Sequence, residues 1–288
     1  MDFVRRDQET APRPFWLQLP TSGETFAAFR ARFDTISPDT VAVESSGSGP
    51  YTIWIDGAVV QEGPVRAKHG ISALAEGSSS LDAGRHTVGI LCHHEGVATR
   101  IIGNLPAHMR CALAVDSVPL ALDWRGTNLG AYETGVRRIN PELGWTDWCD
   151  TSLLPVDWRT AAFDDSDWPS VREVELQGWS VVGGGIGSVS FATDNPVCIA
   201  EGYLAERYGY EKDDPPARFL LRELTSGRIV DDRNRLPSQG VWRRYDIGVI
   251  GLVRPRVQVD VPAGTVIEVG YCEELHEGRV NPFVTLSL

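Results

Sequence analysis

The most constraining feature of this 288-residue chain is a stretch dense in tryptophan and aspartate that runs from Trp145 to Trp168. It contains Pro155 and small polar residues and lacks a helical spacing of apolar residues, which predicts a loop held in place by large aromatic side chains. Together with positions 124 and 179, it brings six of the nine tryptophans into one part of the chain. These are Trp124, Trp145, Trp148, Trp158, Trp168 and Trp179.

Such a cluster is either a platform on which sugars stack or the core of a β-sandwich. Each indole buries roughly 150–250 Å², which is worth roughly 4–6 kcal/mol at about 25 cal/mol per Å². Leaving all six in water would forfeit much of a domain's stability, so most of the six must be buried, and one or two rings remain for the surface. Because sugar recognition combines an exposed ring with a planar polar group, the candidate carbohydrate-binding residues are Trp145, Trp148 and Asp150.

The run from Phe163 to Trp168 reads FDDSDW. It predicts an Asx-type turn, in which carboxylates accept backbone N–H groups and the two aromatic residues act as anchors. Two other hypotheses exist for Asp165 and Asp167, which lie ~6.6 Å apart on one side of an extended chain. They are a calcium site and an acid/base pair, since that separation resembles the spacing of the carboxylates in an inverting glycosidase.

The formal net charge of −12 excludes whole classes of partner. Nucleic acids and anionic membranes are negatively charged and bind proteins through Lys and Arg, so neither is expected as a partner. A neutral or cationic ligand fits the charge better. The N-terminus has arginines but no apolar run of the kind found in secretory signals, and no stretch approaches a membrane span. We therefore expect a cytoplasmic protein.

The five cysteines are odd in number, widely separated and without metal-ligand spacing, which predicts reduced and mostly buried thiols. Cys92 precedes His93 and His94. Only Cys92 and His94 share a side of a strand, so histidines that are hydrogen-bonded or solvent-facing are the preferred interpretation. We expect no cofactor. The glycines between positions 183 and 187 do not follow the GxGxxG pattern, and a linker at 180–190 explains them better.

Several segments alternate and are rich in β-branched residues. Residues 51–55 lead through Asp56-Gly57 into residues 58–60, which predicts a β-hairpin. Further strands are expected at residues 85–94 and 109–115, and another at 120–124. Residues 25–33 fit either a helix or a strand, and the neighbouring strands favour the latter. Strands separated by Gly, Pro, Ser and Asp indicate an antiparallel sandwich or jelly roll.

The chain is long enough for two domains. The predicted fold is all-β, with two tandem β-sandwich domains of the jelly-roll, galactose-binding-domain-like type. Residues 1–24 form an N-terminal arm, residues 25–187 the first sandwich, and residues 188–288 a second sandwich that is incomplete at its C-terminal end. Even spacing of valines up to position 261, and the alternation at 266–271, predict the last strands.

Three runs together carry a resemblance to a known family: YTIWIDGAVVQEGP, ELGWTDWCDTSLLPVDWRTAAFDDSDW and RRYDIGVIGLVRPRVQVDVPAGTVIEVGYCEELHEGRVNP. They look like the N-terminal β-domains of bacterial α-L-rhamnosidases of glycoside hydrolase family 78. The resemblance covers most of residues 25–180 and about 240–282. In that family, inverting hydrolysis resides in a helical (α/α)₆ barrel whose catalytic Asp/Glu motifs have no counterpart here.

The resemblance implies a non-catalytic, truncated fragment of a rhamnosidase-like hydrolase that supports the missing barrel and is inactive alone. It also implies a rhamnose-containing glycoside as a ligand and a homodimer as an assembly. The alternative function is an autonomous, lectin-like carbohydrate-binding module, which the tryptophans beside carboxylates favour. No residue of this chain is assigned a catalytic role.

Overall fold

The computed structural model describes residues 4–6, 10–18, 23–65, 67–68, 70–99, 102–103, 105–136, 138, 142, 144–183, 195–204, 224–226, 240–249, 255–275 and 280. The chain divides into two compact units. Unit 1 comprises Met1–Gly135 and Pro141–Phe191, and unit 2 comprises Val136–Asn140 and Ala192–Leu288. No α-helix occurs in the described residues, so the predicted all-β class is confirmed.

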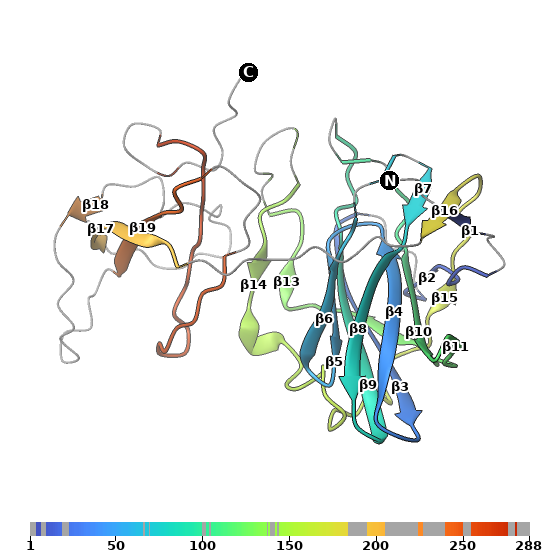
Figure 1. Ribbon diagram of the computed structural model, residues 1–288. Helices are drawn as coiled ribbons and strands as arrows, with labels where there is room; N and C mark the ends of the chain where they lie inside the picture. The colour runs from blue at the N-terminus through green and yellow to red at the C-terminus, as the bar shows by residue number, and fades with distance from the viewer. Residues whose placement is uncertain are drawn as a thin grey trace. The chain divides into compact units, whose positions relative to one another are not determined.

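Unit 1 is a sandwich of two antiparallel sheets (Figure 1). The first sheet has the strand order β15-β2-β10-β4-β8, with β11 paired to β10. Its strands are β2 (Phe15–Trp16), β4 (Asp39–Gly47), β8 (Ala75–Leu81), β10 (Met109–Val115), β11 (Val118–Pro119) and β15 (Arg172–Glu173). The second sheet has the order β12-β3-β9-β5-β6. Its strands are β3 (Thr25–Thr35), β5 (Tyr51–Ile55), β6 (Ala58–Gly63), β9 (Gly84–His94) and β12 (Arg125–Asn128).

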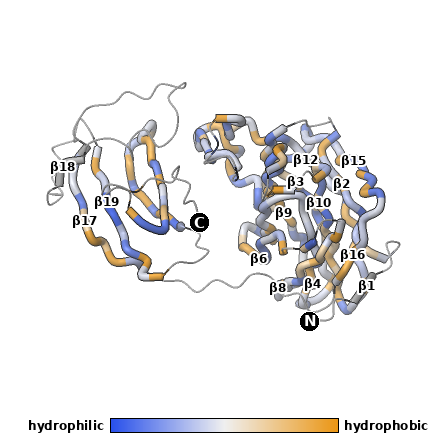
Figure 2. The backbone as a smooth tube through the Cα atoms, turned by 90° about the horizontal axis from the view of Figure 1, so that it is seen from above, coloured by the Kyte–Doolittle hydropathy of each residue, from blue (hydrophilic) through white to orange (hydrophobic). Residues whose placement is uncertain are grey.

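Alternating side chains fill the space between the sheets, and hydrophobic and hydrophilic positions follow one another along the strands (Figure 2). On β3, Phe29 and Phe33 point into this core, where they meet Ile90 and Cys92 of β9 and Val43 of β4. The strands predicted at 25–33, 85–94 and 109–115 are therefore confirmed. The residues at 120–124 carry no strand, and β12 begins directly after them.

The predicted hairpin is confirmed, and its turn does more than reverse the chain. Asp56 and Gly57 both have positive φ angles, 49° and 83°, as the turn requires. The Asp56 carboxylate also accepts the Thr87 N–H at 2.9 Å and lies 2.6 Å from His86 Nδ1. Burial opposes a charge on His86, but hydrogen bonds to Asp56 and to the Asp82 carbonyl outweigh it and raise the pKa of His86. The turn is thereby tied to β9.

The described residues of the predicted N-terminal arm are packed into unit 1. Trp16 has no exposed surface, and Phe15 and Leu17 are buried in the core between the sheets. β2 pairs with β10 and β15. β1 (Val4–Arg6) pairs with β16 (Ser180–Gly183), which also pairs in parallel with β7 (Ile71–Ala73). β16 thus occupies the start of the expected linker, because Val181 and Val182 are buried there, and residues 184–190 lie outside the described residues.

A second hydrophobic cluster covers the outer face of the second sheet. It joins Phe26 and Ala28 of β3 and Trp54 of β5 to Trp158 and Trp168 of the tryptophan-rich stretch. Trp158 lies over Gly89 of β9, where a Cβ atom would stand 3.3 Å from the ring. As predicted, this stretch is mostly loop and pinned by indoles. Of the six tryptophans only three, Trp124, Trp158 and Trp168, are buried, which is fewer than the majority expected. The other three are half-buried.

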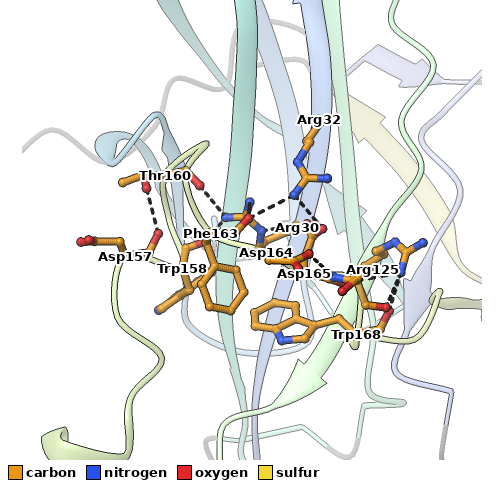
Figure 3. A network of polar contacts seen from close by, with 11 residues as sticks. Arg30, Arg32, Arg125, Asp157, Trp158, Thr160, Phe163, Asp164, Asp165 and Trp168 are labelled. Carbon is orange, nitrogen blue, oxygen red and sulfur yellow. Dashed lines mark hydrogen bonds and ion pairs between the residues drawn. The ribbon is translucent and has the colours of Figure 1, made fainter.

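A buried arginine holds the tryptophan-rich stretch on the sheet. Arg30 points outward from β3 with no exposed surface, and its Nε lies 2.9 Å from Asp165 Oδ2 (Figure 3). Its Nη1 donates to the carbonyls of Trp158 and Thr160. Arg32 reaches the other carboxylate oxygen of Asp165 at 2.9 Å. Two strand residues thus neutralise one loop carboxylate and satisfy several loop carbonyls.

The predicted Asx turn is present next to this pair. Asp164 Oδ1 accepts the Ser166 N–H at 3.0 Å, which lowers the pKa of Asp164. Arg125 of β12 adds hydrogen bonds to the carbonyls of Ser166 and Trp168 at 3.0 and 3.1 Å (Figure 3). The FDDSDW run is therefore a structural corner whose backbone is held from two strands.

Unit 2 contains a three-stranded antiparallel sheet of order β18-β17-β19 in its described part. The strands are β17 (Val197–Leu204), β18 (Leu224–Ser226) and β19 (Val241–Asp246). The strands expected up to position 261 and at 266–271 are absent from the described residues 255–275. Their valines are exposed, Val257 by 52% and Val269 by 50%. An alternating pattern forms a strand only where a neighbouring strand accepts its backbone hydrogen bonds.

Replacing Asp165 by Ala should destabilise unit 1 by about 3–5 kcal/mol, because it leaves the fully buried Arg30 without its counter-charge. Urea unfolding followed by tryptophan fluorescence measures the loss. Asp167→Ala is the matched control, since Asp167 is exposed two residues further on, and it should stay within about 0.5 kcal/mol of the parent. Equal effects of the two substitutions would contradict the assigned role of Asp165.

Candidate functional site

The structure places Trp145, Trp148 and Asp150 on the segment that leads to the short 3₁₀ helix η1 (Thr151–Leu153). Trp145 and Trp148 are half-buried, and Asp150 is exposed. Trp148 belongs to β14 (Trp148–Cys149), which pairs with β13 (Tyr132–Glu133). Asp150 caps η1, with its Oδ1 accepting the Ser152 N–H and hydroxyl at 3.0 and 2.6 Å. These hydrogen bonds lower the pKa of Asp150.

Trp145 is tied to a different place, the chain that follows β9. Its indole Nε1 donates to the Glu95 carbonyl at 3.0 Å, and its backbone N–H lies 3.4 Å from Glu95 Oε2. Glu95 in turn lines a pocket of about 240 Å³. The structure therefore links one predicted residue, Trp145, to a pocket that the sequence did not indicate.

The pocket lies where both sheets of unit 1 reach the same end. Its lining comes from the residue run before β3, the β4–β5 turn and the segment between β9 and β10. The residues are Gly23, Ser48, His94, Glu95, Gly96, Val97, Ile102, Gly103, Leu105, Pro106 and Ala107. Gly96 has φ +60°, and a Cβ there would stand 2.0 Å from the Gly23 carbonyl carbon, so only glycine permits this backbone contact.

Hydrogen bonds preform the walls of the pocket. The Ser48 N–H donates to the His108 carbonyl at 2.9 Å, and the Ser48 hydroxyl accepts the His108 N–H at 3.1 Å. In the segment between β9 and β10, Thr99 N–H donates to the Ile102 carbonyl at 2.8 Å, and Ile102 N–H donates to Thr99 Oγ1 at 2.8 Å. The lining is therefore braced before any ligand enters.

Glu95 has an unfavourable electrostatic environment. Its side chain is 18% exposed. Burial raises the pKa of Glu95, and the carboxylates of Glu24 and Asp147 add to the rise, although His93 and the Trp145 N–H oppose it. The His93 ring is 4.0 Å from Glu95 Oε1 but only 3.0 Å from Glu24 Oε1. His93 therefore interacts more closely with Glu24 than with Glu95, and the charge of the Glu95 carboxylate is poorly compensated.

His93 itself is held by ring stacking. Phe26 lies between the rings of His93 and Tyr132, with both centroid distances at 4.0 Å and interplanar angles of 7° and 9°. Glu24 completes the arrangement by accepting the Gly135 N–H. These contacts make the outer face of β3 and β9 continuous with the segment that carries Trp145.

His94 points to the other side of β9, toward the pocket and the core. Its Nδ1 lies 3.2 Å from Ser48 Oγ. Burial, together with the nearby His93, lowers the pKa of His94, so its ring is neutral at physiological pH. Cys92 is fully buried beside it, and burial raises its pKa to about 12. The prediction of a hydrogen-bonded histidine is confirmed. Of the five cysteines, Cys92 and Cys111 are buried, so the expectation of mostly buried thiols is not met.

The calcium hypothesis for Asp165 and Asp167 has no geometric support. Both oxygens of Asp165 face guanidinium groups, which occupy the positions that a cation would take, and Asp167 is exposed. The same contacts leave Asp165 unsuited to act as one half of an acid/base pair. Within the described part of the chain, no group of three or more His, Cys, Asp or Glu residues is arranged to hold a metal ion. The described residues also include no helix long and apolar enough to cross a membrane.

Comparison with known proteins gives similarity at the level of structure. No family model and no curated protein matches the chain. The rhamnosidase of glycoside hydrolase family 78 from Bacillus sp. GL1 matches with a TM-score of 0.59 and 20% identity, over 67% of this chain and 22% of that chain. An α-L-rhamnosidase from Dictyoglumus thermophilum matches with a TM-score of 0.50 and 14% identity, over 61% and 22%.

This similarity shows the fold. The chain spans only about a fifth of the length of either rhamnosidase, 22% in both cases. A lectin from Pleurotus ostreatus, solved with GalNAc, matches at a TM-score of 0.37, which is too low to support an argument.

Sequence reasoning missed Glu95 and its neighbours. Glu24 and His93 are 69 positions apart and meet because β3 and β9 pair with Thr25 opposite His94. The available signal was the HHE run at 93–95 that ends a predicted strand. It was interpreted only as a pair of solvent-facing or hydrogen-bonded histidines.

Replacing Glu95 by Gln should change the pH dependence of stability. Because the folded-state pKa of Glu95 is raised, its contribution to stability is present below the unfolded-state pKa and is lost as pH rises through the folded-state pKa. The glutamine variant avoids this loss. Its stability relative to the parent should therefore increase from about pH 4 to about pH 7.

Urea unfolding across this pH range measures the difference. Glu173→Gln is the control, since Glu173 is an exposed residue paired with exposed Arg13 and should give a nearly constant difference. If the stability difference between the Glu95 variant and the parent is also independent of pH, the pKa of Glu95 is not raised and this assignment is wrong.

Proposed function

We propose that this chain is a non-catalytic β-sandwich portion of an α-L-rhamnosidase-like glycoside hydrolase and that it supports a separate helical catalytic barrel. The observation that carries the proposal is the fold shared with the Bacillus sp. GL1 enzyme, whose chain is matched over 22% of its length. The order of the three sequence runs described above supports the same assignment.

The surroundings of the carboxylates favour a non-catalytic role. Inverting hydrolysis requires two carboxyl groups about 6.5–9.5 Å apart with space between them for water and a glycosidic bond. Asp165 is instead closed off by Arg30 and Arg32. The side chain of Glu24 is 3% exposed and bonded to His93. Both acids are engaged in holding the fold together.

The direct test is an assay of the purified chain on an aryl α-L-rhamnoside. We expect no turnover above that of heat-denatured protein, because Asp165 is paired with Arg30 and Arg32 and Glu24 is bonded to His93. Robust turnover by the purified chain would refute the proposal, whichever residues were responsible for it.

A second candidate function is autonomous carbohydrate binding. It is favoured by the half-buried rings of Trp145 and Trp148 and by the exposed carboxylate of Asp150. A half-buried indole keeps one surface available for stacking on a sugar while the fold fixes its orientation. The ligand class would be a rhamnose-containing glycoside.

Fluorescence titration of the chain with L-rhamnose and a rhamnose-containing glycoside tests this candidate. Sugar stacking on Trp148 should change its emission, and Trp148→Ala should abolish the change. Trp242→Ala is the control, because Trp242 is also half-buried but lies on β19 in unit 2. Unchanged fluorescence of the parent chain into the millimolar range would remove support for carbohydrate binding at Trp148.

A further inference from the structure

We propose that His86 is a pH-dependent switch at one end of unit 1, closed while both of its ring nitrogens carry a proton and opened when Nε2 loses its proton. The closed state joins the turn between β5 and β6 to the turn between β8 and β9 and to the end of β3. This inference is independent of the proposed relationship to glycoside hydrolases, because it concerns how the fold itself responds to pH.

His86 lies where two connections pass between the sheets of unit 1. Residues 36–38 lead from β3 in the second sheet to β4 in the first, and residues 82–83 lead from β8 back to β9. Thr35 and Gly84 stand opposite each other at the ends of β3 and β9. The His86 side chain is only 10% exposed, so its polar atoms depend on protein partners. A change at His86 therefore acts on both connections.

The Nδ1 atom of His86 faces a carboxylate. It lies 2.6 Å from Asp56 Oδ2, while Asp56 Oδ1 accepts the Thr87 N–H at 2.9 Å. An ionised carboxylate has only acceptors, so a hydrogen bond to it requires a proton on Nδ1. The short distance is typical of a charge-assisted hydrogen bond.

The Nε2 atom also faces acceptors. It lies 2.9 Å from the Asp82 carbonyl oxygen and 3.0 Å from Thr35 Oγ1. A carbonyl oxygen can only accept, and the Thr35 hydroxyl donates its single proton to the same Asp82 carbonyl at 2.7 Å. Both oxygens therefore present lone pairs to Nε2, which requires a proton on this nitrogen as well. With both nitrogens protonated, His86 is an imidazolium cation.

The same hydrogen bonds distinguish this cluster from a hydrolytic triad. Thr35, His86 and Asp56 follow the order of hydroxyl, imidazole and carboxylate that activates a nucleophile. A general base needs a lone pair on Nε2 to take the hydroxyl proton, but here that proton is donated to the Asp82 carbonyl. Thr35 is also buried. The cluster is therefore titratable without being arranged for catalysis.

The charged groups around His86 favour the cation. Burial lowers the pKa of His86, but the hydrogen bonds to Asp56 and to the Asp82 carbonyl raise it. The charges of Asp56 and, from β3, Asp34 add to the rise, and the net result is a raised pKa. Asp34 is exposed and lies 3.4 Å from exposed Arg85, so solvent screens its contribution.

The sign of the pH dependence follows from the raised pKa of His86. Its contribution to stability is complete below the unfolded-state pKa and is lost as pH rises through the folded-state pKa. Loss of the Nε2 proton sets a nitrogen lone pair against the Asp82 carbonyl oxygen at 2.9 Å. That contact changes from attractive to repulsive, so the ring or the turn between β8 and β9 must move.

The opening also affects the turn between β5 and β6, which Asp56 ties to β9. This turn packs against the tryptophan-rich stretch, because a Cβ atom on Gly57 would stand 3.6 Å from Thr160 Cγ2. The Thr160 carbonyl in turn accepts Arg30 Nη1. The switch therefore lies next to the contacts that hold the tryptophan-rich stretch on the second sheet.

Ring ¹⁵N NMR of the full chain tests the protonation state of His86. The chain has six histidines, and His86→Gln assigns the resonances. At pH 7, where an ordinary histidine is mostly neutral, we expect both ring nitrogens of His86 to be protonated. A deprotonated Nε2 at that pH would overturn the proposal.

Amide hydrogen exchange measures the opening. The Gly84 N–H donates to Thr35 Oγ1 and the Thr87 N–H donates to Asp56, so both amides should lose protection as His86 is titrated. Exchange rates are first corrected for their intrinsic increase with pH. Each unit by which the folded-state pKa exceeds the unfolded-state pKa corresponds to about a tenfold loss of protection. Protection that does not change across the titration of His86 contradicts the switch.

Asp56→Asn should lower the pH at which His86 titrates and the two amides open. Asn tolerates the φ of 49° at this position, but it removes the charged acceptor of Nδ1. Asp116→Asn is the matched control, because Asp116 has the same φ of 49° in the turn between β10 and β11. It should leave the titration of His86 unchanged.

Equal titration of the two variants would show that Asp56 does not stabilise the charge on His86, and the proposal would be wrong. If His86 of the parent stays protonated up to the highest pH at which the chain is folded, the Asp56 variant brings the opening into the accessible range. Absence of opening in both proteins overturns the proposal as well.

Discussion

The structure of unit 1 depends on the buried ion pair between Arg30 and Asp165. A guanidinium with no exposed surface is tolerated only if its charge and its donors are matched, because desolvating an unpaired cation is costly. The match comes from a loop 135 positions away. Once that loop is bound, Trp158 and Trp168 cover the outer face of the second sheet, and residues 25–31 of β3 become buried on both sides.

The sequence was sufficient for the parts of the fold that depend on local pattern. The neighbouring strands favoured a strand at residues 25–33, and the Asp56-Gly57 pair identified the hairpin. The pattern did not show that the face carrying Arg30 is covered. An arginine on a strand ordinarily faces solvent, and its burial follows from a distant loop whose pairing leaves no periodic signal. The same limit explains why Trp16 was assigned to a loose arm.

The pocket illustrates a different limit. The rule that neighbouring strand residues face opposite sides was applied correctly to His93 and His94, which do point to the two faces of β9. The rule could not place Glu95, because the chain turns after His94. Glu95 leaves the strand, contacts Trp145 and lies close enough to His93 for a weak interaction at 4.0 Å. Strand periodicity describes residues within a strand and cannot place those just beyond its end.

Two acids of unit 1, buried Asp165 and half-buried Glu95, differ in how well their charges are compensated. Asp165 has a guanidinium group at 2.9 Å from each of its oxygens, so its charge is balanced within the protein. Removing it would leave the Arg30 charge buried and unpaired, which destabilises the fold. Glu95 lies 4.0 Å from His93, which is hydrogen-bonded to Glu24, and the carboxylates of Glu24 and Asp147 lie nearby. A balanced charge contributes to the fold and gains nothing from a ligand. A poorly compensated carboxylate such as that of Glu95 instead costs stability as it ionises, which is what its raised pKa means for the fold.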